Sequence, residues 1–178
     1  TKVLECDPSN REAWVGKGIA GALLSTVTNC RLREALVGYK MAMSCSSDEE
    51  MRRFRDRVVS GISLTAWAFH REARRHLLNW AALGGIYQEY LRNWEMAVEA
   101  LDWARSLDQT DRATLARLIE LHEQVLIPVQ YYRAVGDALP PLSFSHSLPG
   151  AENDRVRKRL ESLHVAMRQM DPSYVPVR

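Results

Sequence analysis

Residues 11–44 read REAWVGKGIAGALLSTVTNCRLREALVGYKMAMS, and residues 80–104 read WAALGGIYQEYLRNWEMAVEALDWA. In both stretches a tryptophan stands four residues before a glycine, and small residues recur at helical spacing further on. This pattern predicts two short helices packed face to face in each stretch, because small side chains let two backbones approach closely. The residues expected at these contacts are Trp14, Gly18, Ala35, Tyr39 and Ala42 in the first stretch, and Trp80, Gly84, Tyr87, Ala97, Leu101 and Ala104 in the second. Since one such pair cannot bury its apolar face alone, the pairs are expected to stack and to leave a groove for a partner.

Capping residues and apolar spacing predict further helices. Ser9 stands three residues before Glu12, and Ser47 stands three residues before Glu50. This is the spacing of a capping box, in which the two side chains satisfy free backbone N–H groups at a helix start. Helices are predicted over about 10–25, 32–44, 77–91, 94–107 and 151–170, with a tight turn at 92–93.

Two other segments allow less definite predictions. Residues 48–75 carry apolar side chains every three or four positions, which is typical of one long helix or of a degenerate helix pair, and both alternatives stay open. A helix beginning at Thr110 or Asp111 keeps its apolar spacing to Val129, with a bend at Pro128 because the proline ring removes a backbone N–H. No strand-like alternation is present, so the expected fold class is all-α. We expect a repeat domain over 1–136, a proline-rich loop over 137–150, and a helix over 151–170 that caps the same domain.

The Trp-xxx-Gly spacing, the later Ala-xxx-[Tyr/Leu]-xx-Ala spacing and the segment Leu-Glu-x-Asp-Pro-x-Asn at 4–10 together resemble the tetratricopeptide repeat. The resemblance covers about 4–44 and 78–108 and is that of a divergent, bacterial-type member, part of whose array is expected upstream. It departs from the family at Gly21, where a large aromatic residue is usual, and at Gln109, where proline is usual. The resemblance implies antiparallel helix pairs stacked into a right-handed superhelix, with the remaining helices closing it as caps.

The resemblance also implies where a partner lies, namely in the concave groove lined by the first helix of each pair. The corresponding positions are Glu12, Val15, Ile19 and Leu23 in the first copy and Ala81, Gly85, Gln88 and Glu89 in the second. Most of these side chains are apolar or small. The chaperone-binding members of the family use Lys, Arg and Asn at such places to hold a terminal carboxylate, and those residues are absent here. We therefore expect a non-enzymatic scaffold that binds a peptide or protein segment through apolar contacts.

The composition excludes several other classes. A net charge of +2 does not by itself indicate a nucleic-acid partner, and no apolar run approaches the roughly 20 residues of a membrane span. Cys6, Cys30 and Cys45 stand far apart, which predicts reduced, mostly buried thiols and favours a cytoplasmic location. The GxGxxG match at 16–21 lies inside a predicted helix with no strand before it, so we assign it to helix packing rather than to a nucleotide. The scattered histidines are His70, His76, His122, His146 and His164, and they predict no metal, no cofactor and no catalytic site.

Two alternative functions stay open. In the first, the chain's own C-terminal helix, from Val156 to Met170, fills the groove, and the module serves self-assembly, including into a homo-oligomer. In the second, the chain is a regulatory domain of a larger complex. The arginine clusters over 52–57, 71–75 and 155–159 leave room for an acidic protein or RNA surface, although interleaved acidic residues favour a solvated helix face and a nucleic-acid partner is not expected.

Overall fold

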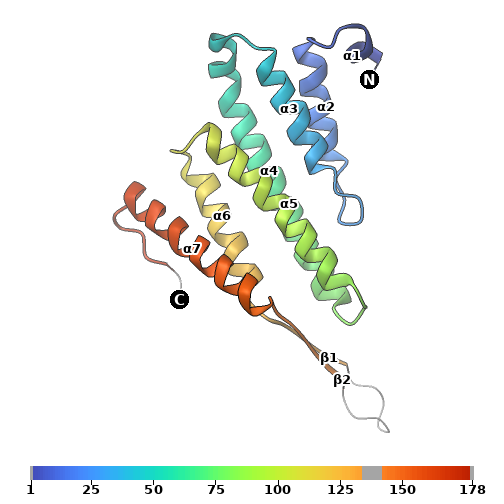
Figure 1. Ribbon diagram of the computed structural model, residues 1–178, viewed down its shortest axis with the longest axis vertical. Coiled ribbons are helices and arrows are strands. Elements are labelled where there is room, and N and C mark those ends of the chain that lie inside the picture. The colour runs from blue at the N-terminus through green and yellow to red at the C-terminus, as the bar shows by residue number, and fades with distance from the viewer. Residues whose placement is uncertain (1, 134–141, 177–178) are drawn as a thin grey trace.

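The computed structural model describes residues 2–133 and 142–176. Figure 1 shows long helices laid side by side, with a two-stranded hairpin projecting from one end. The elements are α1 (Lys2–Cys6), α2 (Arg11–Leu23), α3 (Leu32–Ser44), α4 (Asp48–Trp80), α5 (Ile86–Leu107), α6 (Arg112–Leu126), β1 (Val129–Arg133), β2 (Leu142–His146) and α7 (Gly150–Met170). The mostly helical fold confirms the all-α prediction at the level of fold class.

The first helix pair forms over nearly the predicted ranges, but Ser9 and Glu12 do not form the predicted capping box. The Asn10 side chain caps α2 by accepting a hydrogen bond from the backbone N–H of Ala13 at 2.9 Å. Helices α2 and α3 then run side by side in opposite directions (Figure 1). Their backbones nearly touch, because Gly18 faces the ring of Tyr39 and Gly38 faces the backbone of Gly18. Glycines at this crossing therefore allow an approach that a larger residue would prevent.

Residues 48–80 form one unbroken helix of 33 residues, which settles the alternative left open for 48–75. The capping box of Ser47 and Glu50 is present at its start. Its buried face repeats at helical spacing, and the apolar members are Val58, Val59, Ile62, Ala66, Phe69, Ala73 and Leu77. This stripe packs along α5, so the helix from Val58 to Leu77 is held by tertiary contacts.

The predicted helices over 77–91 and 94–107, with a turn at 92–93, are wrong. The chain reverses at residues 81–85, where Gly85 adopts a φ of 84°, and α5 then continues through 92–93 without a break. The turn falls at the glycines because a left-handed backbone costs a glycine little. Asn93 was expected to form the turn, but it is buried in α5 and donates from its side-chain nitrogen to the backbone oxygen of Val27 at 3.0 Å.

The second tryptophan stretch consequently does not fold like the first. Trp80 ends α4 with 52% of its surface exposed, and Gly84 lies in the turn with no described atom within 4 Å of the position a Cβ would take. The remaining predicted contact residues, Tyr87, Ala97, Leu101 and Ala104, are buried, but all four belong to α5. They pack against other helices, and not as the two halves of one short pair.

The chain after α6 also differs from prediction. Asp111 caps α6 as expected, but the helix ends at Leu126 and does not pass through Pro128. Strand β1 follows and pairs antiparallel with β2, so that Val129 lies opposite His146. Tyr and Phe in these segments favour extended backbone over helix. The predicted loop over 137–150 therefore contains a strand, while residues 134–141 lie outside the described part of the chain.

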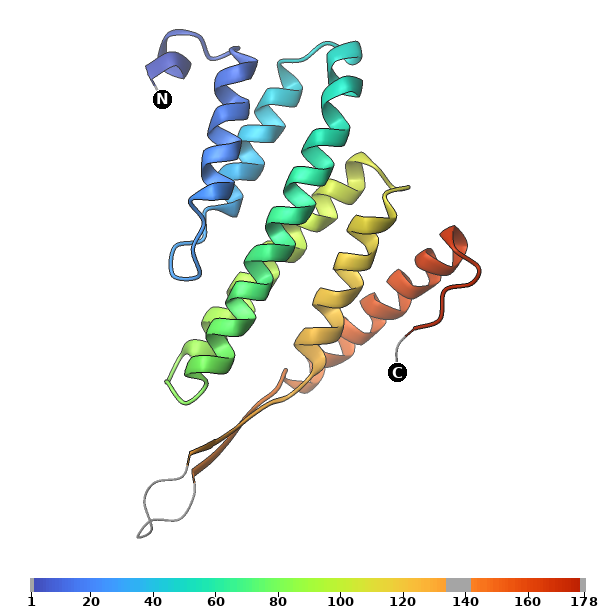
Figure 2. The ribbon, with the colours of Figure 1, turned by 180° about the vertical axis from the view of Figure 1, so that it is seen from behind.

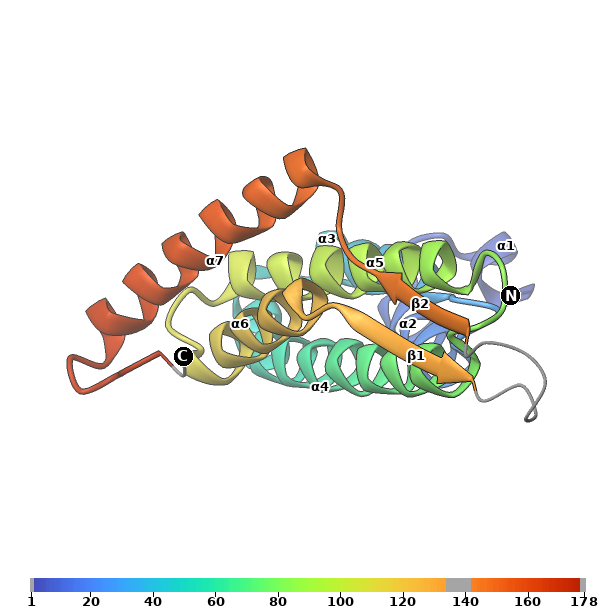
Figure 3. The ribbon, with the colours of Figure 1, turned by 90° about the horizontal axis from the view of Figure 1, so that it is seen from below.

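The helices share one large apolar core. It draws on α3, α4, α5, α6 and α7, and a second cluster lies nearer the hairpin. Helix α7 packs on α6, and its Leu163 and Met167 are buried in the large cluster. Figure 2 shows that α2 lies at one side of the molecule and α7 at the other, and Figure 3 shows α4 and α5 running side by side. A right-handed superhelix of repeats stays a prediction.

Candidate functional site

The predicted groove residues divide into two groups. Glu12, Val15, Ile19 and Leu23 lie on α2, whereas Ala81, Gly85, Gln88 and Glu89 lie in or beside the turn between α4 and α5. In the second group Ala81 is 2% exposed, so its side chain is not available to a partner. The resemblance predicts groove positions at 81–89 only if one helix runs through residue 85. The structure has a turn there, and α5 begins at Ile86.

Helix α2 buries little of its own apolar surface. Only its glycines at 18 and 21 are buried, and both face α3. Ile19 is 44% exposed and Leu23 is 79% exposed, with Leu24 beside them at 56%. Single exposed apolar residues are ordinary, but a contiguous group of them is typical of an interaction surface.

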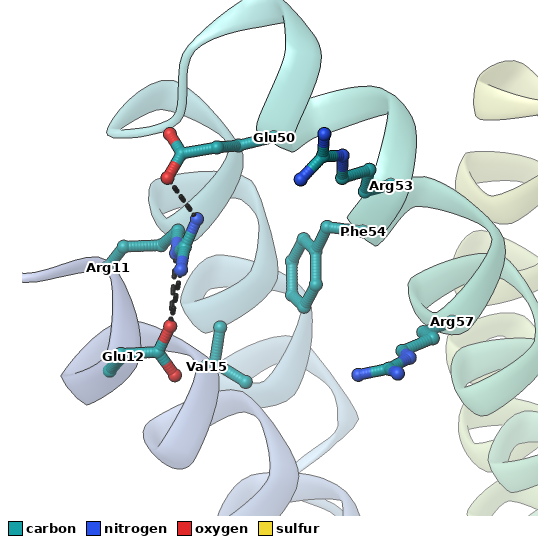
Figure 4. A pocket seen from close by; sticks show the side chains of 7 residues that line it. All are labelled: Arg11, Glu12, Val15, Glu50, Arg53, Phe54 and Arg57. Atoms are coloured by element: carbon teal, nitrogen blue, oxygen red, sulfur yellow. Dashed lines mark hydrogen bonds and ion pairs between the residues drawn. The ribbon is translucent and has the colours of Figure 1, made fainter.

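A cleft opens between the first turns of α2 and α4. We call it the α2–α4 cleft and define it by its seven lining residues, Arg11, Glu12, Val15, Glu50, Arg53, Phe54 and Arg57. Its volume is about 460 Å³, and Figure 4 shows the seven side chains. Glu12 and Val15 of the predicted groove line it, and none of the four residues from the α4–α5 turn does.

One end of the cleft is closed by an ion-pair network. The guanidinium of Arg11 donates to Glu12 at 2.6 Å and to Glu50 at 2.7 Å, which links α2 to α4 (Figure 4). The pKa of Arg11 is raised, chiefly by its hydrogen bond to Glu12. The pKa of Glu50 is lowered, chiefly because its carboxylate accepts the backbone N–H of Ser47 in the capping box. Arg11 is therefore already paired with two carboxylates.

The other end combines an apolar floor with two guanidinium groups. Val15 and Phe54 are half-buried and come together from α2 and α4 (Figure 4). Arg53 pairs with Glu49 one turn earlier on α4. Arg57 is exposed and makes no hydrogen bond or ion pair with any residue that the structure describes. This end can thus contact an apolar group and a negative charge together.

Further along α4, several polar side chains make hydrogen bonds or cation–π contacts with neighbouring side chains. The indole Nε1 of Trp67 donates to Glu120 on α6 at 2.7 Å, and the guanidinium of Arg71 lies 4.7 Å from the Trp67 ring centroid. Arg117 donates to the Ser63 hydroxyl at 2.7 Å. The contacts of Trp67 with Glu120 and of Ser63 with Arg117 join α4 to α6, and we assign them to the stability of the fold.

The buried histidines do not form an accessible reaction centre. His70 is fully buried, its Nε2 lies 3.1 Å from the Tyr90 hydroxyl, and burial lowers its pKa to about 3. His122 is buried as well, with a lowered pKa from the same cause, and its Nδ1 bonds the backbone oxygen of Leu118. Within residues 2–133 and 142–176, no group of three or more His, Cys, Asp or Glu is placed to hold a metal ion. None of the three thiols forms a disulfide, and the predicted burial is wrong, because Cys6 is exposed and Cys30 and Cys45 are only half-buried.

The C-terminal helix does not fill the α2–α4 cleft, contrary to one alternative. It packs on α6, and the cleft is lined by α2 and α4 alone. Sequence reasoning missed Phe54 as a site residue, and it considered Arg53 and Arg57 only as part of a charge cluster. Glu50, Arg53, Phe54 and Arg57 stand three or four positions apart, which places them on one face of α4. This spacing can be read from the sequence alone.

Comparison of this chain with protein-family models, with curated proteins and with solved structures finds no match. In the part of the chain that the structure describes, every helix is too short or too polar to cross a lipid bilayer.

Proposed function

We propose that this chain is a non-enzymatic interaction scaffold that holds a protein or peptide segment against α2 and in the α2–α4 cleft. We also propose that α2 and α3 form a repeat pair of the tetratricopeptide type, on the strength of their sequence spacing and close glycine contacts. The observation that carries the binding proposal is the exposed apolar side of α2, at Ile19 and Leu23, continuing into a cleft with an apolar floor. A helix or extended segment laid along an apolar groove is a common mode of recognition.

Substituting both Ile19 and Leu23 with aspartate is expected to reduce partner capture about a hundredfold. Each buried aliphatic side chain contributes about 1.5 kcal/mol, and every 1.4 kcal/mol is a factor of ten in affinity. Both side chains are exposed in the free chain, so its helical circular dichroism should not change. The measurement is affinity capture from a cell extract with quantitative mass spectrometry, comparing this variant with the unaltered chain.

Val165→Asp is the matched control, because Val165 is 50% exposed on α7, away from the cleft. The control should recover the same proteins as the unaltered chain. Equal recovery by the Ile19 and Leu23 variant, or no specific recovery by the unaltered chain, would contradict the proposal.

A further inference from the structure

We infer that the α2–α4 cleft takes a peptide segment in which an aspartate or glutamate stands beside an aliphatic or aromatic residue. This inference rests on the proposed function and adds the chemistry of the partner. It follows from the charges and apolar surface that the seven lining residues present together.

The charge argument depends on Arg57. Of the three arginines that line the cleft, Arg11 binds two carboxylates and Arg53 binds one, whereas Arg57 binds none among the described residues. A guanidinium stays ionised at any physiological pH and matches the two oxygens of a carboxylate. An incoming carboxylate can therefore pair with Arg57 without breaking an existing ion pair.

The apolar argument depends on Phe54, which lies between Arg53 and Arg57 in Figure 4 and faces Val15. A carboxylate bound at Arg57 places the adjoining residues of its chain over this floor. Aliphatic or aromatic side chains there would cover Phe54 and Val15 and remove apolar surface from water. Ile19 lies one turn beyond Val15 on α2 and extends the same surface.

A nucleic acid fits the same cleft less well. Glu12 and Glu50 line it as well, and a chain of phosphates would bring negative charge against both. A peptide can place one carboxylate at Arg57 and keep the rest of its length uncharged.

The test is selection from a phage-displayed library of random 12-residue peptides against the full chain. We expect enriched sequences in which Asp or Glu adjoins Leu, Ile, Val or Phe. Arg57→Glu should weaken the best of these peptides about tenfold or more, because it removes the pairing cation and sets a like charge against the peptide's carboxylate. Selection against the Arg57→Glu variant should enrich Lys or Arg in place of the acid.

Lys158→Glu, an equal change of charge at an exposed position on α7, should leave the selected sequences and their affinity unchanged. Apolar sequences without an acidic bias, or acidic ones insensitive to Arg57→Glu, would overturn this inference and leave the proposed function standing. Failure to enrich any peptide would overturn both. A labelled single-stranded RNA that binds the unaltered chain but not Arg57→Glu would replace the peptide with a nucleic acid.

Discussion

Replacing Gly38 with alanine is expected to lower the free energy of unfolding by about 3 kcal/mol, the upper part of the usual range for overpacking. The added methyl carbon would lie 2.5 Å from the backbone nitrogen of Gly18, 2.7 Å from its Cα and 2.9 Å from the backbone oxygen of Trp14. All three neighbours are backbone atoms of α2, so no side chain can rotate to make room. The two helices must move apart, and the contacts between them weaken.

Gly16→Ala is the matched control within the same hairpin. Gly16 lies in α2, and no described atom is within 4 Å of the position its Cβ would take. Alanine there should stabilise the chain by about 0.5 to 1 kcal/mol, because glycine is the poorer helix former. Urea denaturation followed by circular dichroism measures both changes. A Gly38→Ala variant as stable as the unaltered chain would show that α2 and α3 do not pack as described.

The stability of the chain is expected to fall steeply as the pH drops from about 6.5 towards 3, and His70 is expected to be a main cause. The pKa of His70 is lowered from 6.5 to about 3, first by burial and then by the charges of Arg74 and His122. In the unfolded chain this histidine takes up a proton near pH 6.5, while the folded chain keeps it neutral. Its contribution is complete above pH 6.5 and is lost as the pH falls, by at most about 1.4 kcal/mol per pH unit.

His70→Phe should flatten this dependence. The phenylalanine ring keeps most of the apolar volume, and Tyr90 keeps the positive charge of Arg74 nearby. The measurement is urea denaturation at a series of pH values from 7 to 4, comparing slopes rather than absolute stabilities. His76→Phe is the control, because His76 is only half-buried and makes no hydrogen bond with a described residue. Identical slopes for the unaltered chain and His70→Phe would exclude His70 as the cause.

The sequence allowed the first helix pair to be predicted because its signals are local. The Ser9–Glu12 spacing marked the start of α2 to within about two residues, although Asn10 and not Ser9 caps the helix, and Trp14 and Gly18 fall on one helical face. The prediction of the second pair was wrong because Ala97, Leu101 and Ala104 have the spacing of any buried helical face. That spacing does not show where the helix begins. Gly84 and Gly85 indicate a chain reversal more strongly than residues 92–93 do. The resemblance to a repeat instead predicts a helix at these two glycines.

The α2–α4 cleft could not be derived from local patterns. Arg11 and Glu50 meet across 39 positions of sequence, and their pairing depends on how α2 and α3 together dock on α4. Helical spacing places Phe54 and Arg57 on one face of α4, but it does not identify the element opposite. The predicted groove residues at 81–89 rest on a resemblance alone, and they require a helix that the glycine turn interrupts.

The most direct test of the account is to map the bound peptide on the chain by nuclear magnetic resonance. The isotope-labelled full chain would be titrated with the most enriched library peptide, and the amide and methyl shifts followed. We predict changes concentrated at Val15, Ile19, Phe54 and Arg57, on α2 and the first turns of α4. Changes concentrated on α7 or on the β1–β2 hairpin, with α2 unaffected, would contradict the assignment of the α2–α4 cleft as the binding surface.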